Sequence, residues 1–308
     1  GMEVSNAGLY DGSTATAEAA LMACRITQRE KVAVLATVNP RYIKVVQTYL
    51  SGRDFPVIKI DPTQPLPPDC ACLIVQKPNF FGYFEDLGSY VQKANHSGAL
   101  LIAITDPISL GMFQPPGEYG ADIVVAEGQS LGNPPSFGGP GLGIFTCRKE
   151  YLRQMPGRIV GKTVDTEGKA GYVLTLATRE QHIRRERATS NITTNEALVA
   201  LATTVYLATL GKSGLRQVAE LCYHKAHYAA EAIARLKGYS LVFRQPFFKE
   251  FVIRCPVAPK KINKALFQEK IIGGLDISEI VKNSLLICVT EMNTKDEIDR
   301  LVKVLGEF

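Results

Sequence analysis

The sequence predicts an α/β protein with a large domain built on a mostly parallel sheet and a smaller C-terminal α+β domain. Short apolar runs alternate with helical patterns up to about residue 146, which is typical of a parallel sheet covered on both faces. Two long helical patterns and a mixture of strands and helices then follow. The 308 residues are 46% hydrophobic and 21% charged, so the chain can bury one large core and a smaller one.

Composition argues against several classes of function. The net charge of +5 is spread along the chain except for a cluster at 179–187, so we do not expect nucleic-acid binding. Seven cysteines, an odd number with several in apolar runs, indicate a reducing, cytoplasmic environment. No run approaches 18 apolar residues, so no membrane span is expected. Cys222, His224 and His227 have offsets that scatter around a helix, so no metal site is expected either.

The first half of the chain is predicted to alternate between helices and strands. A helix over 13–26 has Asp11 or Ser13 as its N-cap, and its start at 11–15 is a candidate anion site. Asn39 and Pro40 begin a second helix over 41–50. A third helix is predicted from about Gly82, with its apolar positions on one face. Apolar strands are expected at 32–38, 56–60, 72–75, 100–104, 122–125 and 142–146.

Three turns are expected to meet at one functional edge, because ligands gather at the carboxyl ends of parallel strands. They lie at 76–81, at 105–107 and from Glu127 onward. The third continues to Gly143 and is rich in glycine and proline, which allows unusual backbone conformations and close approach. It contains no lysine or histidine, and it lacks the lysine and hydroxyl residue that end a P-loop. We therefore expect no nucleotide site there.

The second half begins with a hairpin over 158–164 and 172–176. A polar block at 178–193 follows, with four arginines and one histidine. It is either a solvated face of a surface helix or an interface whose arginines hold carboxylates of a partner or substrate. The remaining elements are helices at 195–210, 214–236, 262–268 and from 294, and strands at 241–243, 251–253 and 285–289. We expect a large domain at 1–205, with the hairpin and Arg-rich block at 158–194, and a small domain at 206–308.

Several segments together resemble the glycine-cleavage P-protein, in particular the first subunit of its two-chain form. These segments are 4–19, 116–123, 128–129 with 138–140, 155–161 and the polar block. The resemblance covers essentially the whole chain. It implies the aspartate-aminotransferase-like fold of pyridoxal-phosphate enzymes, fold type I. Chains of this family usually extend well upstream of Met2, so an N-terminal region is expected to be missing here.

The glycine-rich turn departs from the catalytic subunit of that family. There, a His-Lys pair precedes a Gly-Gly-Pro-Gly run, and the lysine forms a Schiff base with pyridoxal phosphate. Counting back from Gly138, the pair falls at Gly128 and Gln129. Glutamine cannot form this bond. Asp106 lies roughly where a cofactor-ring aspartate would be expected, but the spacing differs and no role is carried onto it.

The resemblance thus implies a subunit without covalent cofactor or catalytic residues of its own. Pyridoxal phosphate would be held by the catalytic second subunit, in a cytoplasmic hetero-oligomer, a heterotetramer. The complex would decarboxylate glycine and pass the aminomethyl group to the lipoyl group of H-protein. Candidates to face the partner or the shared active site are Asn6, Tyr10, Asp11, Gln129, Arg179, His182, Arg184, Arg185 and Asn191.

Two other functions remain open from the sequence. An autonomous pyridoxal-phosphate enzyme, such as an aldolase or aminotransferase relative, would need a lysine at a strand end beside the glycine-rich loop; Lys149 and Lys162 fit poorly. A noncatalytic assembly or regulatory protein could keep the same fold. Co-purification with a lysine-bearing subunit would favour the glycine decarboxylase subunit over this noncatalytic protein.

Overall fold

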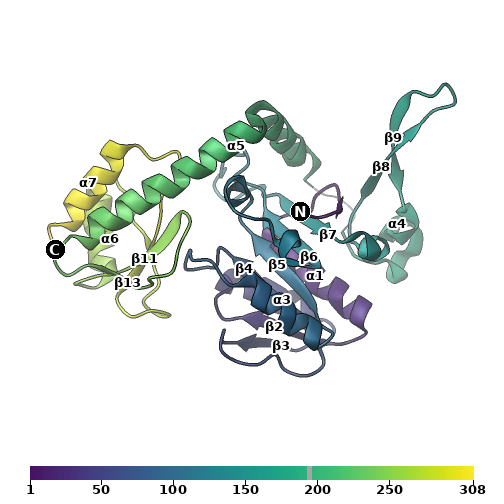
Figure 1. Cartoon of the computed structure of the whole chain (residues 1–308), viewed down its shortest axis with the longest axis horizontal. Helices are drawn as coiled ribbons and strands as arrows, with labels where there is room; N and C mark the ends of the chain where they lie inside the picture. Colours follow the sequence, from purple (N-terminus) through teal and green to yellow (C-terminus); the bar gives the residue numbers. More distant parts are fainter. Residues whose placement is uncertain (193–195) are drawn as a thin grey trace. The chain divides into compact units, whose positions relative to one another are not determined.

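The computed structural model describes residues 1–192 and 196–308 (Figure 1). Its contacts divide the chain into two compact units. Unit 1 comprises Gly1–Lys77, Asp86–Pro107 and Phe113–Gly211. Unit 2 comprises Pro78–Glu85, Ile108–Met112 and Lys212–Phe308. Each unit therefore contains segments that are distant in the sequence.

Unit 1 is built on a seven-stranded sheet, in the order β1-β7-β6-β5-β4-β2-β3. Strands β2 to β6 are parallel to their neighbours, while β7 is antiparallel to β6 and β1 to β7. The predicted mostly parallel sheet is thus confirmed. The strands are β1 Val4–Ser5, β2 Lys31–Leu35, β3 Val57–Ile60, β4 Cys70–Lys77, β5 Leu100–Thr105, β6 Ile123–Glu127 and β7 Gly143–Cys147.

Helices α1 Gly12–Thr27 and α2 Pro40–Ser51 pack together, and α1 also lies on the central strands. Asn39 caps α2, as predicted, and of the two N-caps considered for α1, Asp11 and not Ser13 has that role. The alanines of α1 are fully buried, which lets the helix approach the sheet closely. Helix α3 Leu87–His96 lies against β4 and β5. Right-handed crossovers place α2 and α3 on opposite faces of the sheet.

The predicted start of the third helix is wrong. Helix α3 begins at Leu87, with Asp86 as N-cap, rather than near Gly82. Gly82 has a φ of +92°, and its carbonyl accepts a hydrogen bond from the Phe248 backbone at 3.1 Å. The preceding segment 78–85 is therefore a turn tied to unit 2, not the first turn of a helix.

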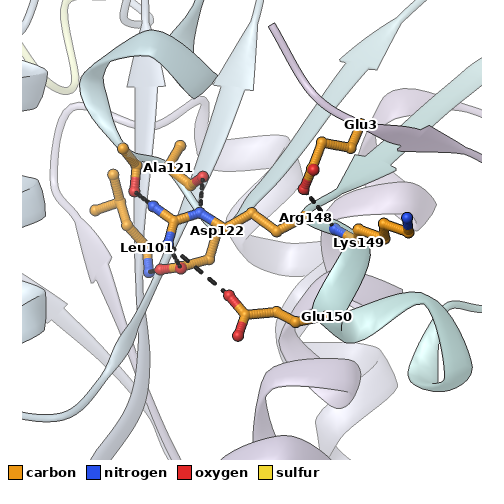
Figure 2. Close-up of polar contacts among 8 residues, drawn as sticks. Glu3, Leu101, Ala121, Asp122, Arg148, Lys149 and Glu150 are labelled. Carbon is orange, nitrogen blue, oxygen red and sulfur yellow. Dashed lines mark hydrogen bonds and ion pairs between the residues drawn. The ribbon is translucent and has the colours of Figure 1, made fainter.

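A half-buried ion pair lies at the amino ends of β5 and β6, at the opposite end of the sheet from the predicted ligand turns (Figure 2). The Asp122 carboxylate accepts the Leu101 backbone N–H at 2.8 Å and lies 3.4 Å from the Arg148 guanidinium. Burial raises the pKa of Asp122, while the Leu101 hydrogen bond and Arg148 oppose this shift. Arg148 also donates to the carbonyls of Gly120 and Ala121. Because this cluster lies at the edge away from the predicted ligand turns, we assign it to stability.

The hairpin and polar block complete the main features of unit 1. Strands β8 Ile159–Val164 and β9 Ala170–Thr175 pair antiparallel, close to their predicted bounds. The block folds as α4 Gln181–Arg184 between short 3-10 turns rather than as one helix, since Arg185 has a φ of +52°. Thr193 lies outside the described residues. The 3-10 turns of the chain are at Pro107–Gly111, Pro116–Tyr119, Lys149–Gln154, Ala177–Arg179 and Arg185–Arg187.

Helix α5, Ala197–Ala234, carries the chain from unit 1 into unit 2. Gly211 interrupts it with a φ of +61°, so the two predicted helices form one broken helix; residue 195 lies outside the described part. By length and composition alone α5 could cross a membrane, which for a single helix is weak evidence. The prediction of no membrane span therefore stays a prediction.

Unit 2 has a four-stranded antiparallel sheet in the order β10-β11-β13-β12. Its core joins the second part of α5 to this sheet and two helices, through residues such as Ile233, Phe251 and Leu285. A capping box formed by Thr294 and Glu297 starts the last helix. The elements are β10 Ser240–Leu241, β11 Glu250–Arg254, α6 Pro259–Gln268, β12 Leu275–Asp276, β13 Ser284–Cys288 and α7 Lys295–Leu305.

Candidate functional site

The carboxyl ends of β4, β5 and β6 meet at one edge of the unit 1 sheet. The registers place Lys77 beside Thr105, and Thr105 beside Ala126. Asp106 and Glu127 follow these last two positions directly. The prediction that the ends of these three strands share one edge is confirmed.

Glu127 organises this edge, a role that the sequence alone does not indicate. Its carboxylate accepts backbone N–H groups of Gly12 at 2.8 Å, Gln129 at 2.9 Å and Leu142 at 2.9 Å. One side chain therefore joins the end of β6, both ends of the glycine-rich loop and the start of α1. The only signal in the sequence was a carboxylate at the end of an apolar strand.

The start of α1 has no N–H group left for an external anion among its first three. Ser13 and Thr14 donate to the Asp11 carboxylate at 2.8 and 3.0 Å, and Gly12 donates to Glu127. Free N–H groups and a positive helix end are what make a helix start attract phosphate. The carboxylates of Asp11 and Glu127 already bind these N–H groups and already neutralise the positive helix end. The suggested anion site at 11–15 is therefore wrong.

Tyr42 lies directly over this helix start. A carbon added to Gly12 would lie 2.5 Å from its hydroxyl oxygen, so glycine is needed for this close approach. Burial raises the pKa of Tyr42, and the charges of Glu127, Asp11 and Asp106 raise it further. The tyrosine is therefore a neutral hydrogen-bonding group facing an acidic edge, which again disfavours an anion.

Gln129, at the position expected for a lysine, is committed to its own loop. Its side-chain amide donates to the carbonyl of Asn133, whose side chain donates to Thr203 of α5 at 2.8 Å. Gln129 thus fixes the turn.

Neither lysine considered for an autonomous enzyme lies at this edge. Lys149 follows Arg148 at the opposite end of the sheet, where its backbone N–H donates to Glu3 (Figure 2). Lys162 is exposed in the hairpin. Lys77 does end β4, but its ammonium lies 3.9 Å from the centre of the Tyr119 ring.

Asn6 and Arg179 meet at one turn, residues 155–157, which begins the hairpin. The Asn6 amide donates to Pro156 at 3.0 Å, and the Arg179 guanidinium donates to the carbonyls of Met155 and Gly157. Both side chains are buried, and burial lowers the pKa of Arg179. These two candidates hold the base of the hairpin instead of pointing outward.

Tyr10 and Asn191 line one cavity of about 690 Å³ in unit 1, beside α1. Glu18 and Arg25 also line it. Burial raises the pKa of Glu18 and lowers the pKa of Arg25. Among the described residues, Glu18 Oε2 and Arg25 Nε have no hydrogen-bond partner. The helix pattern of the sequence could not show that Glu18 is buried and Arg25 partly buried.

The remaining candidates lie on the surface of the polar block. His182, Arg184 and Arg185 are exposed, and the His182 ring lies 3.8 Å from the buried Glu180 carboxylate. Within the described residues, no group of three or more His, Cys, Asp or Glu side chains could hold a metal ion. Among the candidates, Asn6, Asp11, Gln129 and Arg179 bond to the backbone of this chain, Tyr10 is half-buried, and the others are exposed.

The fold is that of the fold-type-I pyridoxal-phosphate enzymes. A sphingosine-1-phosphate lyase from Burkholderia pseudomallei has a TM-score of 0.67 at 15% identity, covering 97% of this chain and 69% of that one. A structure titled as a C-DES mutant with glycine covalently linked to the pyridoxal-phosphate cofactor has a TM-score of 0.68 at 14% identity. The match covers 97% of this chain and 80% of that one. These likenesses concern the fold alone, and they confirm the predicted fold class.

The chain belongs to the glycine cleavage system P-protein family, whose model matches residues 1–305. A "probable glycine dehydrogenase (decarboxylating) subunit 1" of Thermomicrobium roseum is 51% identical over all of this chain and 72% of its own length. The protein of the same name in Desulforamulus reducens is 52% identical over 99% of this chain and 72% of its own length. A crystal structure of an inhibitor-bound glycine decarboxylase P-protein has a TM-score of 0.96 at 40% identity, covering 99% and 72%. The resemblance seen in the sequence is thus confirmed.

Proposed function

We propose that this chain is the subunit of a heteromeric glycine decarboxylase that carries no cofactor. Pyridoxal phosphate is held by a second subunit, which decarboxylates glycine and passes the aminomethyl group to the lipoyl group of H-protein. The relatives' name, subunit 1 of glycine dehydrogenase (decarboxylating), supports a second subunit. The complex is a cytoplasmic hetero-oligomer, a heterotetramer, without nucleic-acid, membrane or metal partners.

The observation that carries this proposal is that the polar groups beside the carboxyl end of β6 already bond to other groups of this chain. Pyridoxal phosphate needs an amine for its aldehyde and donors for its phosphate. Gln129 offers no amine, and its side chain is bonded to Asn133. The first three N–H groups of α1 are bonded to Asp11 and Glu127. The cofactor does not fit these residues, and no step of the reaction is assigned to them.

The contribution of this chain is to support and complete the partner's active site. Tyr10, Asp11, His182, Arg184, Arg185 and Asn191 are proposed to face the second subunit or the channel for the lipoyl arm. Exposed guanidinium groups suit this role, since they bind carboxylates through two parallel hydrogen bonds. Asn6, Gln129 and Arg179 hold the backbone that presents them.

The cofactor assignment is tested by adding pyridoxal phosphate to the chain alone. We expect no new absorbance band and no adduct after borohydride reduction. Reduction followed by peptide mapping of the trypsin digest is the measurement. An adduct on one specific lysine, such as Lys77 at the end of β4, would overturn the proposal in favour of an autonomous enzyme.

The assignment of the polar block is tested by Arg184→Ala and Arg185→Ala in the chain reconstituted with its second subunit and H-protein. We expect at least about a tenfold loss in assembly affinity or in glycine–bicarbonate exchange, as is typical of buried interface arginines. Arg153→Ala, another exposed arginine of unit 1, is the matched control. Unchanged assembly and exchange in both variants would contradict the assignment.

A further inference from the structure

The hairpin of β8 and β9 presents an apolar face to solvent. Residues opposite one another in the ribbon share a face, and the register pairs Val160 with Leu174 and Val164 with Ala170. Tyr172 and its partner Lys162 lie between them on the same face, so the apolar side chains surround one exposed ammonium group. All of these side chains are exposed, Tyr172 at 72%. Figure 1 shows the ribbon extending away from the sheet of unit 1.

This ribbon is poorly suited to stand alone in water. A two-stranded hairpin is marginally stable by itself, and a contiguous exposed apolar face commonly marks an interaction surface. Its base is nevertheless firmly held. Ile159 is buried in the core of unit 1, and Asn6 and Arg179 bond to the turn at 155–157. The structure therefore fixes the direction of the ribbon and leaves its apolar face uncovered.

We infer that this face, formed by Val160, Val164, Ala170, Tyr172 and Leu174, docks against the lysine-bearing second subunit. The inference rests on the proposed function, and it names the surface through which this chain would bind the second subunit. The face is continuous in sequence with the exposed arginines of the polar block. Specific interfaces bury at least about 1,200 Å² in total, more than five side chains supply, so the face and the polar block act as one contact.

A membrane is a poorer occupant for the same face. The turn of the ribbon carries Asp165 and Glu167, and the latter is paired with Lys169 at 2.7 Å. Inserting the tip into a bilayer would strip water from these carboxylates, whereas the rim of a protein interface keeps them solvated. The apolar side chains lie along the side of the ribbon, as contact with a second protein surface requires.

The test compares two opposite faces of the same strand. Tyr172→Ser with Leu174→Ser removes the apolar face, whereas Val173→Ser changes the opposite face, where Val173 is 50% exposed. With the full chain and the second subunit, we expect the double variant to raise Kd at least about tenfold and the control less than about threefold. Equal Kd values for the double variant and the unaltered chain, or equal losses in both variants, would overturn the inference.

A second measurement does not depend on the variants folding. Hydrogen exchange of the unaltered chain should slow at residues 160–174 when the second subunit is added. No protection there in a formed complex would overturn the inference but leave the proposed function standing. Absence of any complex would overturn the proposed function itself, and this inference with it. Slower exchange at these residues on self-association or on binding to anionic vesicles, but not with the second subunit, would also overturn the inference. The face would then bind a second copy of this chain or a membrane.

Discussion

At the residue scale, Glu127 shows how one carboxylate can join distant parts of the chain. It lies at the end of β6 and accepts three backbone N–H groups from three segments. Each of these donors would otherwise need another partner in a partly buried place, because unpaired backbone groups are costly. The stability of the α1 start and of the glycine-rich loop therefore depends on the same side chain.

We predict that Glu127→Gln lowers the free energy of unfolding by about 1–3 kcal/mol. The side-chain NH2 group of glutamine would face backbone N–H groups that now donate to a carboxylate oxygen. Urea unfolding followed by far-UV circular dichroism measures this loss. Glu186→Gln is the control, because its side chain is 79% exposed. Equal stability of both variants would show that the Glu127 hydrogen bonds contribute little.

The buried Glu18 gives a prediction about pH. Burial raises its pKa, so the folded chain holds this proton more tightly than the unfolded chain does. Stability then falls as pH rises through the interval between the two pKa values, and it is constant below that interval. Glu18→Gln should therefore gain stability relative to the unaltered chain as pH rises from about 4 to 7. Urea midpoints across this range test it. A parallel pH dependence of the two proteins would contradict it, and Glu167→Gln is the exposed control.

Individual roles were only partly predictable from the sequence. Asp11 was identified as an N-cap because capping depends on near neighbours. Gln129 was identified by its distance from a glycine run. The backbone-holding roles of Glu127 and the buried Arg179 could not be predicted, since Gly12 and Met155, to which they bond, lie far away in the sequence and only the folded chain brings them near.

At the scale of elements, the turn at Gly82 decides where α3 begins. Its φ of +92° suits glycine alone, and a carbon added there would collide with the Glu250 carbonyl. The sequence pattern in this region favoured a helix because apolar residues recurred at helical spacing. The pattern was misleading because Phe84 bonds through its backbone to Pro246. Two-residue strands such as β1 and β12 were missed because so short a segment carries no periodicity.

We predict that Gly82→Ala lowers the free energy of unfolding by more than about 2 kcal/mol, because it combines backbone strain with a collision. Gly171→Ala is the matched control, since nothing lies within 4 Å of the added carbon. It should change stability by less than about 0.5 kcal/mol. Thermal unfolding of both variants is the measurement, and equal midpoints would refute the account of this turn.

At the scale of the whole molecule, the parallel sheet and the family were predictable, because both rest on patterns that run along the chain. The division into units was harder to predict. Unit 2 takes up 78–85 and 108–112 in addition to its C-terminal segment. Phe81 packs there with Val252 and Leu286. A boundary drawn once along the sequence, such as 205/206, cannot describe such a unit.

A fragment of residues 206–308 should consequently unfold without a cooperative transition. It lacks Phe81 and the backbone partners that segment 78–85 gives to Pro246 and Phe248. Differential scanning calorimetry of the fragment beside the full chain tests this. A sharp transition with an enthalpy in proportion to its length would show instead that the C-terminal segment folds independently.

The carboxylates at the start of α1 also bear on how the subunit responds to the supply of pyridoxal phosphate. A protein that binds a cofactor gains stability from it in proportion to the logarithm of the cofactor concentration. In the proposed function this chain holds no cofactor, because Asp11 and Glu127 already accept N–H groups of the helix start, so we expect no such dependence. The chain should reach the same Tm with and without pyridoxal phosphate, and a scarcity of the cofactor would limit the activity of the complex without shortening the lifetime of this subunit.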